Sequence, residues 1–371
     1  MKKILAALLS FVLVMSASIT AFGATTSDVD KTLESSVKFV YGDKEAFDVS
    51  ESKDYYLYLM AGEYDEKLEE SYFNSVKKAL DGGQKFDIGT LGLIISNFIM
   101  SLEDPTDFEG YNLLELFEKT ELSENDNMYT YMYAADVALF LEDQALSKQI
   151  CNAMISKYTM GKGTDFWGGW GTSADDLSVF ILTLSTFEDE YKNYIDDALT
   201  LLKGYNTEAG YDNYGANANS TALALAAYVS VLDDESAEDA YNKLMLFYNK
   251  EAGSFTSNYD DVLSTKDAIF GLSYYWLIAD LDDDDDDYND PSTDTDKEEK
   301  PTSPIVNIKD KNDTENVSSS NATNSVKDEN EAKPPVKAPE KSPATGADAA
   351  VFALFAMLAA GGTMVVSKKK K

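Results

Sequence analysis

The sequence contains no histidine, no arginine and a single cysteine. Histidine is the side chain that most often serves as an acid, a base or a metal ligand near neutral pH, so catalysis and metal binding of that kind are excluded. One cysteine excludes an internal disulfide and every cysteine-cluster metal site. Without arginine, no guanidinium can hold a phosphate or a carboxylate by paired hydrogen bonds. We therefore expect no metal and no cofactor.

Basic residues are scarce compared with acidic ones. The 371 residues include 31 Lys+Arg against 66 Asp+Glu, which gives a net charge of −35. A charge of this sign repels nucleic-acid phosphates, so no nucleic-acid partner is expected. Hydrophobic residues make up 44% and aromatic residues 12%, which is enough for a substantial core.

The first 24 residues have the pattern of a secretory signal peptide. Lys2 and Lys3 form a positive start, and an apolar run follows from Ile4 to Val14. The sequence Ala21-Phe22-Gly23 fits the small residues of a cleavage site, and polar residues follow from Thr25. Residues 1–24 are therefore predicted to be removed on secretion.

The last 30 residues combine three features in order: a short motif, an apolar run at 349–366 and the lysines Lys368 to Lys371. The run is near the minimum length of a membrane helix, and the lysines are expected on its cytoplasmic side. The end resembles the LPxTG sorting signal of Gram-positive sortase substrates, with serine in place of leucine; its motif here is Ser342-Pro343-Ala344-Thr345-Gly346. The resemblance implies cleavage between Thr345 and Gly346, linkage of the threonine carboxyl to peptidoglycan, and sortase as a partner. A plain membrane anchor is the alternative.

Residues 282–341 contain an unbroken acidic run, Asp282 to Asp287, followed by a stretch rich in Pro, Ser, Thr, Asn and Lys. Low hydrophobicity and charge repulsion oppose a packed core in such a segment. We expect a disordered linker that spans the cell wall. The acidic run lacks the glycine and final glutamate of an EF-hand loop, so at most weak cation binding is expected.

Residues 25–281 alternate helical patterns with two kinds of loop, one short and acidic, the other longer and rich in Gly, Asn and aromatic residues. Helices that follow the long loops are apolar nearly all round, which indicates burial on all sides. Helices that follow the short loops are amphipathic, for example Glu190 to Lys203 and Ala237 to Lys250. The buried helices start at regular intervals of 41 to 45 residues. The residues near these starts are Thr90, Ala135, Asp176, Thr221 and Thr265. Such a period predicts a helical array.

The fold class predicted for this region is all-α, an α/α toroid of about six helix pairs, because six buried inner helices favour closure over an open array. The segment Lys162-Gly163-Thr164-Asp165-Phe166-Trp167-Gly168-Gly169-Trp170 resembles the Lys-Gly-x-x-Phe…Gly-x-Trp repeat of the terpene cyclase and prenyltransferase superfamily. Glu208 to Tyr211 and Asn219 to Leu225 resemble the same repeat. The resemblance covers roughly residues 80–280 and implies the fold, not an activity.

The activities of that superfamily are not expected here. Its cyclases use an Asp-x-Asp-Asp acid, whereas Ser173-Ala174-Asp175-Asp176 lacks the first aspartate. Its protein prenyltransferases hold zinc with a histidine, which this chain lacks. Cys151 lies on an amphipathic helix and is predicted to be a small buried hydrophobe.

A glycan hydrolase or lyase is the enzymatic alternative, because α/α barrels host both and paired carboxylates at the mouth would be required. The acidic candidates in or beside the long loops are Asp175, Asp176, Asp212 and Asp260, and Asp175 and Asp176 equally suit a helix N-terminus. Aromatic and amide residues that could contact a sugar or another ligand are Trp167, Trp170, Tyr211, Tyr214, Asn217 and Tyr259. The repeated aromatics also suit packing between repeats.

We expect the long loops and the starts of the inner helices to converge on one end of the toroid. The sequence favours a cell-wall-anchored surface protein of a Gram-positive bacterium that binds an extracellular glycan, peptide or small polar molecule at that end. A glycan-degrading enzyme and a purely adhesive or structural protein are the two alternative hypotheses.

Overall fold

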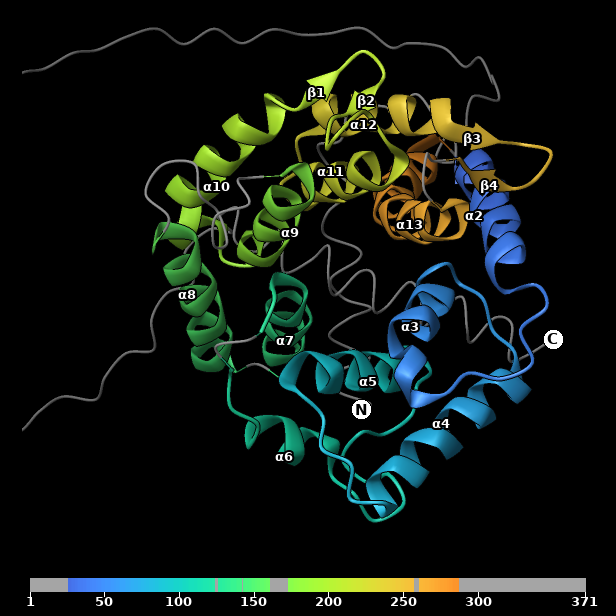
Figure 1. Ribbon diagram of the computed structural model, residues 1–371, viewed down its shortest axis with the longest axis vertical. Coiled ribbons are helices and arrows are strands. Elements are labelled where there is room, and N and C mark those ends of the chain that lie inside the picture. The colour runs from blue at the N-terminus through green and yellow to red at the C-terminus, as the bar shows by residue number, and fades with distance from the viewer. Residues whose placement is uncertain (1–25, 124–125, 142, 161–172, 257–259, 287–371) are drawn as a thin grey trace, which may run out of the picture. The chain divides into compact units, whose positions relative to one another are not determined.

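The computed structural model describes residues 26–123, 126–141, 143–160, 173–256 and 260–286. All of them belong to one compact unit of the chain. The described unit is mostly helical, and its few strands are two residues long (Figure 1). The prediction of an all-α fold is confirmed.

Six helices form the interior of the unit, and each packs against the next in a closed series of contacts. The series runs α3–α5–α7–α9–α11–α13 and returns from α13 to α3 (Figure 1). Their bounds are α3 Ser52–Met60, α5 Ile88–Met100, α7 Met128–Phe140, α9 Ala174–Ser185, α11 Ala218–Ser230 and α13 Asp261–Asp286. These inner helices correspond to the apolar segments of the repeat.

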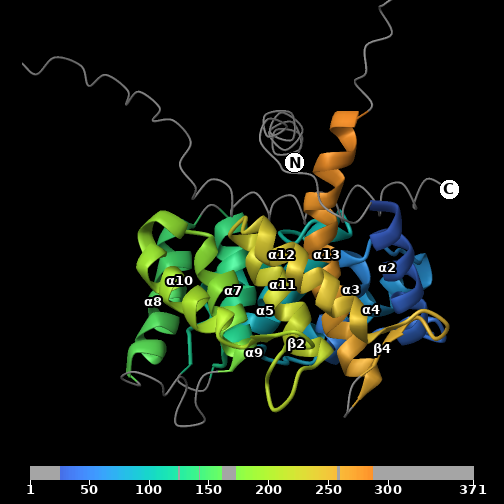
Figure 2. The same cartoon turned by 90° about the horizontal axis from the view of Figure 1, so that it is seen from above.

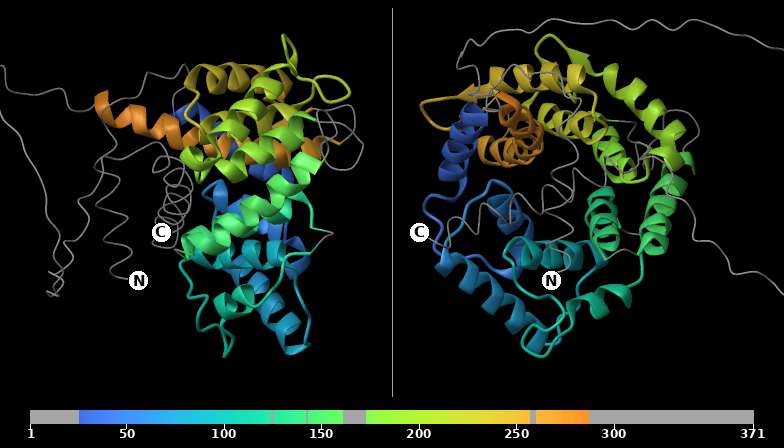
Figure 3. Two further views of the ribbon diagram at one scale, coloured as in Figure 1. Left: turned by 90° about the vertical axis from the view of Figure 1, so that its left-hand side faces the viewer. Right: turned by 180° about the vertical axis from the view of Figure 1, so that it is seen from behind.

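The remaining helices lie outside the inner ones (Figure 3). Helices α6, α8, α10 and α12 pack on α5, α7, α9 and α11 respectively, and α2 packs on α13. Their bounds are α2 Thr26–Tyr41, α4 Glu66–Asp81, α6 Leu113–Glu118, α8 Gln144–Met160, α10 Glu188–Lys203 and α12 Asp234–Leu244. The first described helix thereby contacts the last described one, and the Trp276 indole N–H donates to Asp30 at 2.6 Å across that contact.

Local sequence signals explain where these helices begin. Asp87 precedes α5 and its carboxylate accepts the Thr90 N–H at 2.8 Å. Asn127 and Ser173 cap α7 and α9 in the same way. Such caps satisfy backbone donors that the first turn leaves unpaired. The interior of α5 carries no charged side chain, and nearly all of it is buried, as expected for a helix that is apolar all round.

Two hairpins occupy loops that the sequence analysis treated as irregular. Strands β1 Asn206–Thr207 and β2 Gly210–Tyr211 pair antiparallel, and so do β3 Tyr248–Asn249 and β4 Ser254–Phe255. A predicted outer helix from Ala237 to Lys250 is therefore wrong at its end. It stops at Leu244, a short 3-10 helix follows at Met245–Phe247, and the chain then enters the second hairpin.

The predicted end of the folded region at Leu281 is also wrong. Helix α13 continues to Asp286 and takes in most of the acidic run that was assigned to the linker. No helix in the described ranges has the length and apolar character needed to span a bilayer. The predicted signal peptide, the rest of the linker, the 349–366 segment and the motif from Ser342 to Gly346 lie outside the described residues.

Candidate functional site

The first turns of the inner helices lie at one end of the unit, together with both hairpins. Figure 2 shows β2 and β4 at the same edge as the start of α13. The hairpins are fixed to the helices by repeated contacts. The Thr221 hydroxyl accepts the Tyr211 N–H at 3.0 Å, and the Thr265 hydroxyl accepts the Phe255 N–H at 2.9 Å. Each hairpin is thus held against the helix that follows it.

Polar side chains from these first turns form a connected group, which we call the polar belt and define as Lys53, Tyr129, Asp175, Asn219, Lys266 and Asp267. The Lys53 ammonium lies 3.6 Å from the Asp267 carboxylate and joins α3 to α13. The Asn219 amide donates to the same carboxylate at 2.9 Å and joins α11 to α13. Lys266 pairs with Asp54 at 2.6 Å, a second link between α13 and α3.

Tyr129 brings α7 into the polar belt. The Lys53 ammonium lies 5.4 Å from the centre of its ring, a cation–π distance. Burial raises the pKa of Tyr129 well above its ordinary value, and the nearby carboxylates of Asp267 and Asp175 add to the shift. Five of the six inner helices therefore contribute a polar or charged side chain to one region.

Asp175 is the member of the polar belt with unused hydrogen-bonding capacity. Its Oδ2 accepts from the Asn213 amide at 3.2 Å. Its buried Oδ1 and the buried Ser220 hydroxyl make no hydrogen bond of ordinary geometry with described residues, although Ser220 lies close enough to lower the pKa of Asp175. Burial raises the pKa of Asp175, the carboxylates of Asp267 and Asp176 add to the shift, and Ser220 and Asn213 oppose it. Buried polar atoms without partners are rare and call for an explanation such as a bound ligand.

A second carboxyl, Asp136, lies further along α7. It shares a helix face with Tyr129 and Tyr133, because residues three and four apart are neighbours on a helix. Burial raises the pKa of Tyr56 on α3, of Tyr133 and of Tyr274 on α13, and the ionised Asp136 adds to each shift, which places all three phenols within its electrostatic reach. We call Asp136 with these three residues the tyrosine-lined carboxyl.

Asp136 accepts no hydrogen bond and has no cation beside it within the described part of the chain. Burial alone raises its pKa to about 8, although the residue keeps partial contact with solvent. The three phenols are 4% to 6% exposed. Asp136 was not among the candidate site residues predicted from the sequence. Its signal was the one charged side chain in the apolar segment from Met128 to Phe140.

Of the four predicted acidic candidates, Asp175 and Asp176 lie in the first turn of α9. Burial raises the pKa of Asp176, and its N–H donates to Ser173, so it belongs to the helix start. Asp212 and Asp260 are exposed, and each accepts a backbone hydrogen bond from its own loop or helix start. Asp212 accepts the Gly215 N–H at 2.7 Å, and Asp260 accepts the Val262 N–H at 2.8 Å. Only Asp175 combines a position in the polar belt with an unpartnered atom.

The residues predicted to contact a ligand also lie in different environments. Tyr211 is 0% exposed and its hydroxyl donates to the Tyr228 hydroxyl at 3.0 Å, so its ring offers no face to a ligand and that assignment is corrected. Asn217 caps α11 by accepting the Ser220 N–H at 2.9 Å. Tyr214 is 85% exposed at a turn. Trp167, Trp170 and Tyr259 lie outside the described residues.

Cys151 is buried, as predicted, and packs among apolar residues of the core. Its thiol lies 3.7 Å from the Thr183 carbonyl oxygen, and burial raises its pKa to about 12. The thiolate that nucleophilic chemistry needs is therefore scarce at neutral pH. The residue serves packing.

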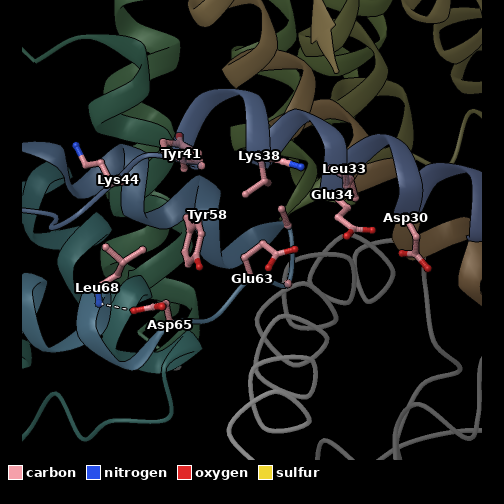
Figure 4. A pocket seen from close by; sticks show the side chains of 14 residues that line it. Asp30, Leu33, Glu34, Lys38, Tyr41, Lys44, Tyr58, Glu63, Asp65 and Leu68 are labelled. Carbon is pink, nitrogen blue, oxygen red and sulfur yellow. Dashed lines mark hydrogen bonds between the residues drawn. The ribbon is translucent and has the colours of Figure 1, made fainter. Parts of the chain in front are cut away.

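A groove of about 650 Å³ lies elsewhere, between α2, the end of α3 and the start of α4 (Figure 4). Its polar groups serve local structure. Asp65 accepts the Leu68 N–H at 3.0 Å and caps α4, Lys44 pairs with Glu51, and Asp30 accepts the Trp276 indole N–H. The polar belt, with its unpartnered atoms, is the stronger candidate for a ligand site.

No group of three or more potential metal ligands occurs among the described residues. The polar belt can donate hydrogen bonds from two ammonium groups and an amide, and can accept them at carboxylates, so it suits a polar organic ligand. Comparisons with protein-family models, with curated proteins and with solved structures find no match to this chain.

Proposed function

We propose that this protein is secreted by a Gram-positive bacterium, joined to its cell wall by a sortase, and binds an extracellular ligand through the polar belt of an α/α toroid. Closure into a toroid is supported by the series of contacts that runs from α3 to α13 and back to α3. Packing of α2 on α13 gives further support, because an open array would leave its first and last helices apart.

The observation that carries ligand binding is that the buried Asp175 Oδ1 of the polar belt and the nearby buried Ser220 Oγ make no hydrogen bond of ordinary geometry, whereas the other polar groups of the belt are paired. Leaving such atoms without a partner costs about 1–3 kcal/mol each. A ligand that donates to Asp175 and either donates to or accepts from Ser220 would remove that cost. A neutral glycan, a peptide or a small polar molecule has groups of this kind.

A glycan-degrading enzyme is the second candidate, and Asp136 is the specific observation that favours it. A carboxyl with a pKa of about 8 is protonated at neutral pH and can act as a general acid. Glycoside hydrolysis would also need a second carboxyl group, for which Asp267 of the polar belt is a candidate. Release of shorter sugars from a bound oligosaccharide would favour the enzyme over the binding module.

Anchoring makes a direct prediction. In a host that carries the matching sortase, the protein is expected in the wall fraction, released by muramidase, and shortened at its C-terminus to Thr345. A Thr345→Ala variant is expected to lose wall linkage and to remain in the membrane fraction with its lysine tail. Cell fractionation followed by mass spectrometry of the C-terminal peptide measures both. Unprocessed protein that keeps its tail in the wild type would contradict the proposal.

Ligand binding by the polar belt is tested with the purified full chain on an array of neutral oligosaccharides and short peptides. Asp175→Asn is expected to weaken binding by about tenfold, because a buried charged acceptor contributes about 1.5–3 kcal/mol. Asp212→Asn removes the same charge from an exposed loop position and is the matched control. Absence of any bound probe, or equal affinity for all three proteins, would reject the polar belt as the site.

A further inference from the structure

The tyrosine-lined carboxyl is unusual in what it lacks. Among the described residues Asp136 accepts no hydrogen bond and has no cation beside it, and no described partner hydrogen-bonds to the hydroxyls of Tyr56, Tyr133 or Tyr274. The carboxylate and the three phenol hydroxyls therefore keep hydrogen-bonding capacity that a ligand could use. The arrangement therefore resembles a binding site more than a part of the core.

We propose that the tyrosine-lined carboxyl binds a compact organic ammonium group, so that the ligand of the proposed surface protein carries a positively charged amine. This inference rests on the proposed ligand-binding function and names the chemistry of the ligand. Asp136 supplies the counter-charge. Phenol rings from three helices supply the polarisable faces that attract ammonium groups.

The geometry of the rings supports this choice. The Tyr56 and Tyr133 rings lie 5.8 Å apart in an edge-to-face arrangement, with 73° between their planes. Tyr274 belongs to α13, so the group draws on α3, α7 and α13. Rings held on separate helices at such angles can present both faces and edges to one small guest, as in an aromatic cage.

The surrounding charge selects a cation over an anion or a neutral ligand. The lysines of the polar belt, Lys53 and Lys266, are engaged with Asp267 and Asp54. An anion would lie beside Asp136 with no cation to offset the repulsion between them. A neutral guest would leave Asp136 in its protonated form and gain no charge attraction, whereas an ammonium stabilises the ionised form. The net charge of −35 also draws cations toward the protein over long range.

Other titratable groups around Asp136 leave its charge uncompensated. Helix α3 contributes Tyr56, α13 contributes Tyr274, and α8 contributes Cys151, whose pKa the ionised Asp136 raises. Helix α5 carries no acidic or basic residue. Helix α9 carries Asp175 and Asp176 in its first turn, and neither contributes to the shift at Asp136. A bound ammonium would be the nearest opposite charge.

The binding must be linked to a proton. At neutral pH Asp136 holds its proton, since its pKa is about 8, and a bound ammonium favours the ionised form. Each binding event therefore releases a proton to the buffer. Affinity is expected to rise about tenfold per pH unit below pH 8 and to level off above it.

Titration calorimetry of the full chain tests this with choline, with its neutral isostere 3,3-dimethyl-1-butanol, and with potassium and calcium chloride. We expect choline to bind about tenfold more tightly than the isostere. Proton release is expected to show as a heat that depends on the buffer. Asp136→Asn is expected to abolish the pH dependence and to weaken choline binding by at least about tenfold.

A second variant guards against a folding artefact. Tyr274→Leu keeps the carboxyl and is expected to weaken choline binding severalfold while proton release persists. Equal binding of choline and its isostere, affinity independent of pH, no choline binding, or preference for a metal ion would each overturn the inference. Binding of oligosaccharides through Asp175 in the same protein would leave the proposed function intact, which separates the two failures.

Discussion

Replacing Asp136 with asparagine is expected to raise the free energy of unfolding by about 5 kcal/mol at pH 8 and to change it by less than about 1 kcal/mol at pH 4. The ordinary pKa of an aspartate is 3.8, and burial raises that of Asp136 to about 8 in the folded chain. Between these values the unfolded chain gives up a proton that the folded chain retains. Stability is therefore lost as the pH rises from about 4 to about 8, and the loss levels off above pH 8.

Asparagine has nearly the same shape and no proton to lose, so the variant escapes this cost. Urea denaturation of the two full-length proteins at pH 4, 6 and 8 measures the difference, which should grow with pH. Asp212→Asn is the matched control, because Asp212 is exposed and its change should alter stability by less than about 0.5 kcal/mol at every pH. A constant difference between wild type and Asp136→Asn would contradict the buried-carboxyl interpretation.

This expected gain bears on function. A chain selected for stability alone would replace Asp136, since a single substitution removes the cost. Retaining an unpaired acid at a cost in stability is typical of sites that need its chemistry. Both the ammonium site and the glycan-cleaving alternative use this group, the first as a counter-charge and the second as a proton donor. Proton release on ligand binding, with no cleavage of the ligand, would favour the ammonium site over the glycan-cleaving enzyme.

The helical architecture could be predicted because its cause is periodic. Segments such as Ile88 to Met100 are apolar all round and recur at a nearly constant interval, so burial of alternate helices follows from the sequence. The hairpins could not be predicted in this way. Strands of two residues carry no alternating pattern, and their positions depend on contacts such as that of Thr221 with the Tyr211 backbone.

The candidate site could be predicted only in part. Asp175 was found because it follows a long loop, and loops at helix starts are visible in sequence. Asp136 was missed because it sits inside an apolar helix, where its neighbours come from α3 and α13, far away along the chain. The end of α13 was misplaced because repulsion among aspartates was weighed without the tendency of a formed helix to propagate. Tertiary contacts decided each of these cases.

A close approach of two inner helices, α11 and α13, leads to the other large prediction. A Cβ at Gly271 on α13 would lie 2.4 Å from the Ala222 carbonyl oxygen and 3.0 Å from its carbonyl carbon on α11. Both atoms are backbone, so neither can rotate away. Gly271→Ala must push the two helices apart, and overpacking of this kind costs about 1–3 kcal/mol, occasionally more.

We expect Gly271→Ala to lower the free energy of unfolding by about 2 kcal/mol, after allowing about 1 kcal/mol for the better helix propensity of alanine. The midpoint of thermal unfolding should fall by about 4–8 °C. Gly82→Ala is the control, because Gly82 ends α4 and its Cβ would approach backbone oxygens no closer than 3.3 Å. Adding Ala222→Gly should not rescue the variant, since the atoms that clash are backbone. Rescue, or a midpoint at or above that of the wild type, would show that α11 and α13 do not meet at this glycine, and the closed series of inner helices would lose one of its links.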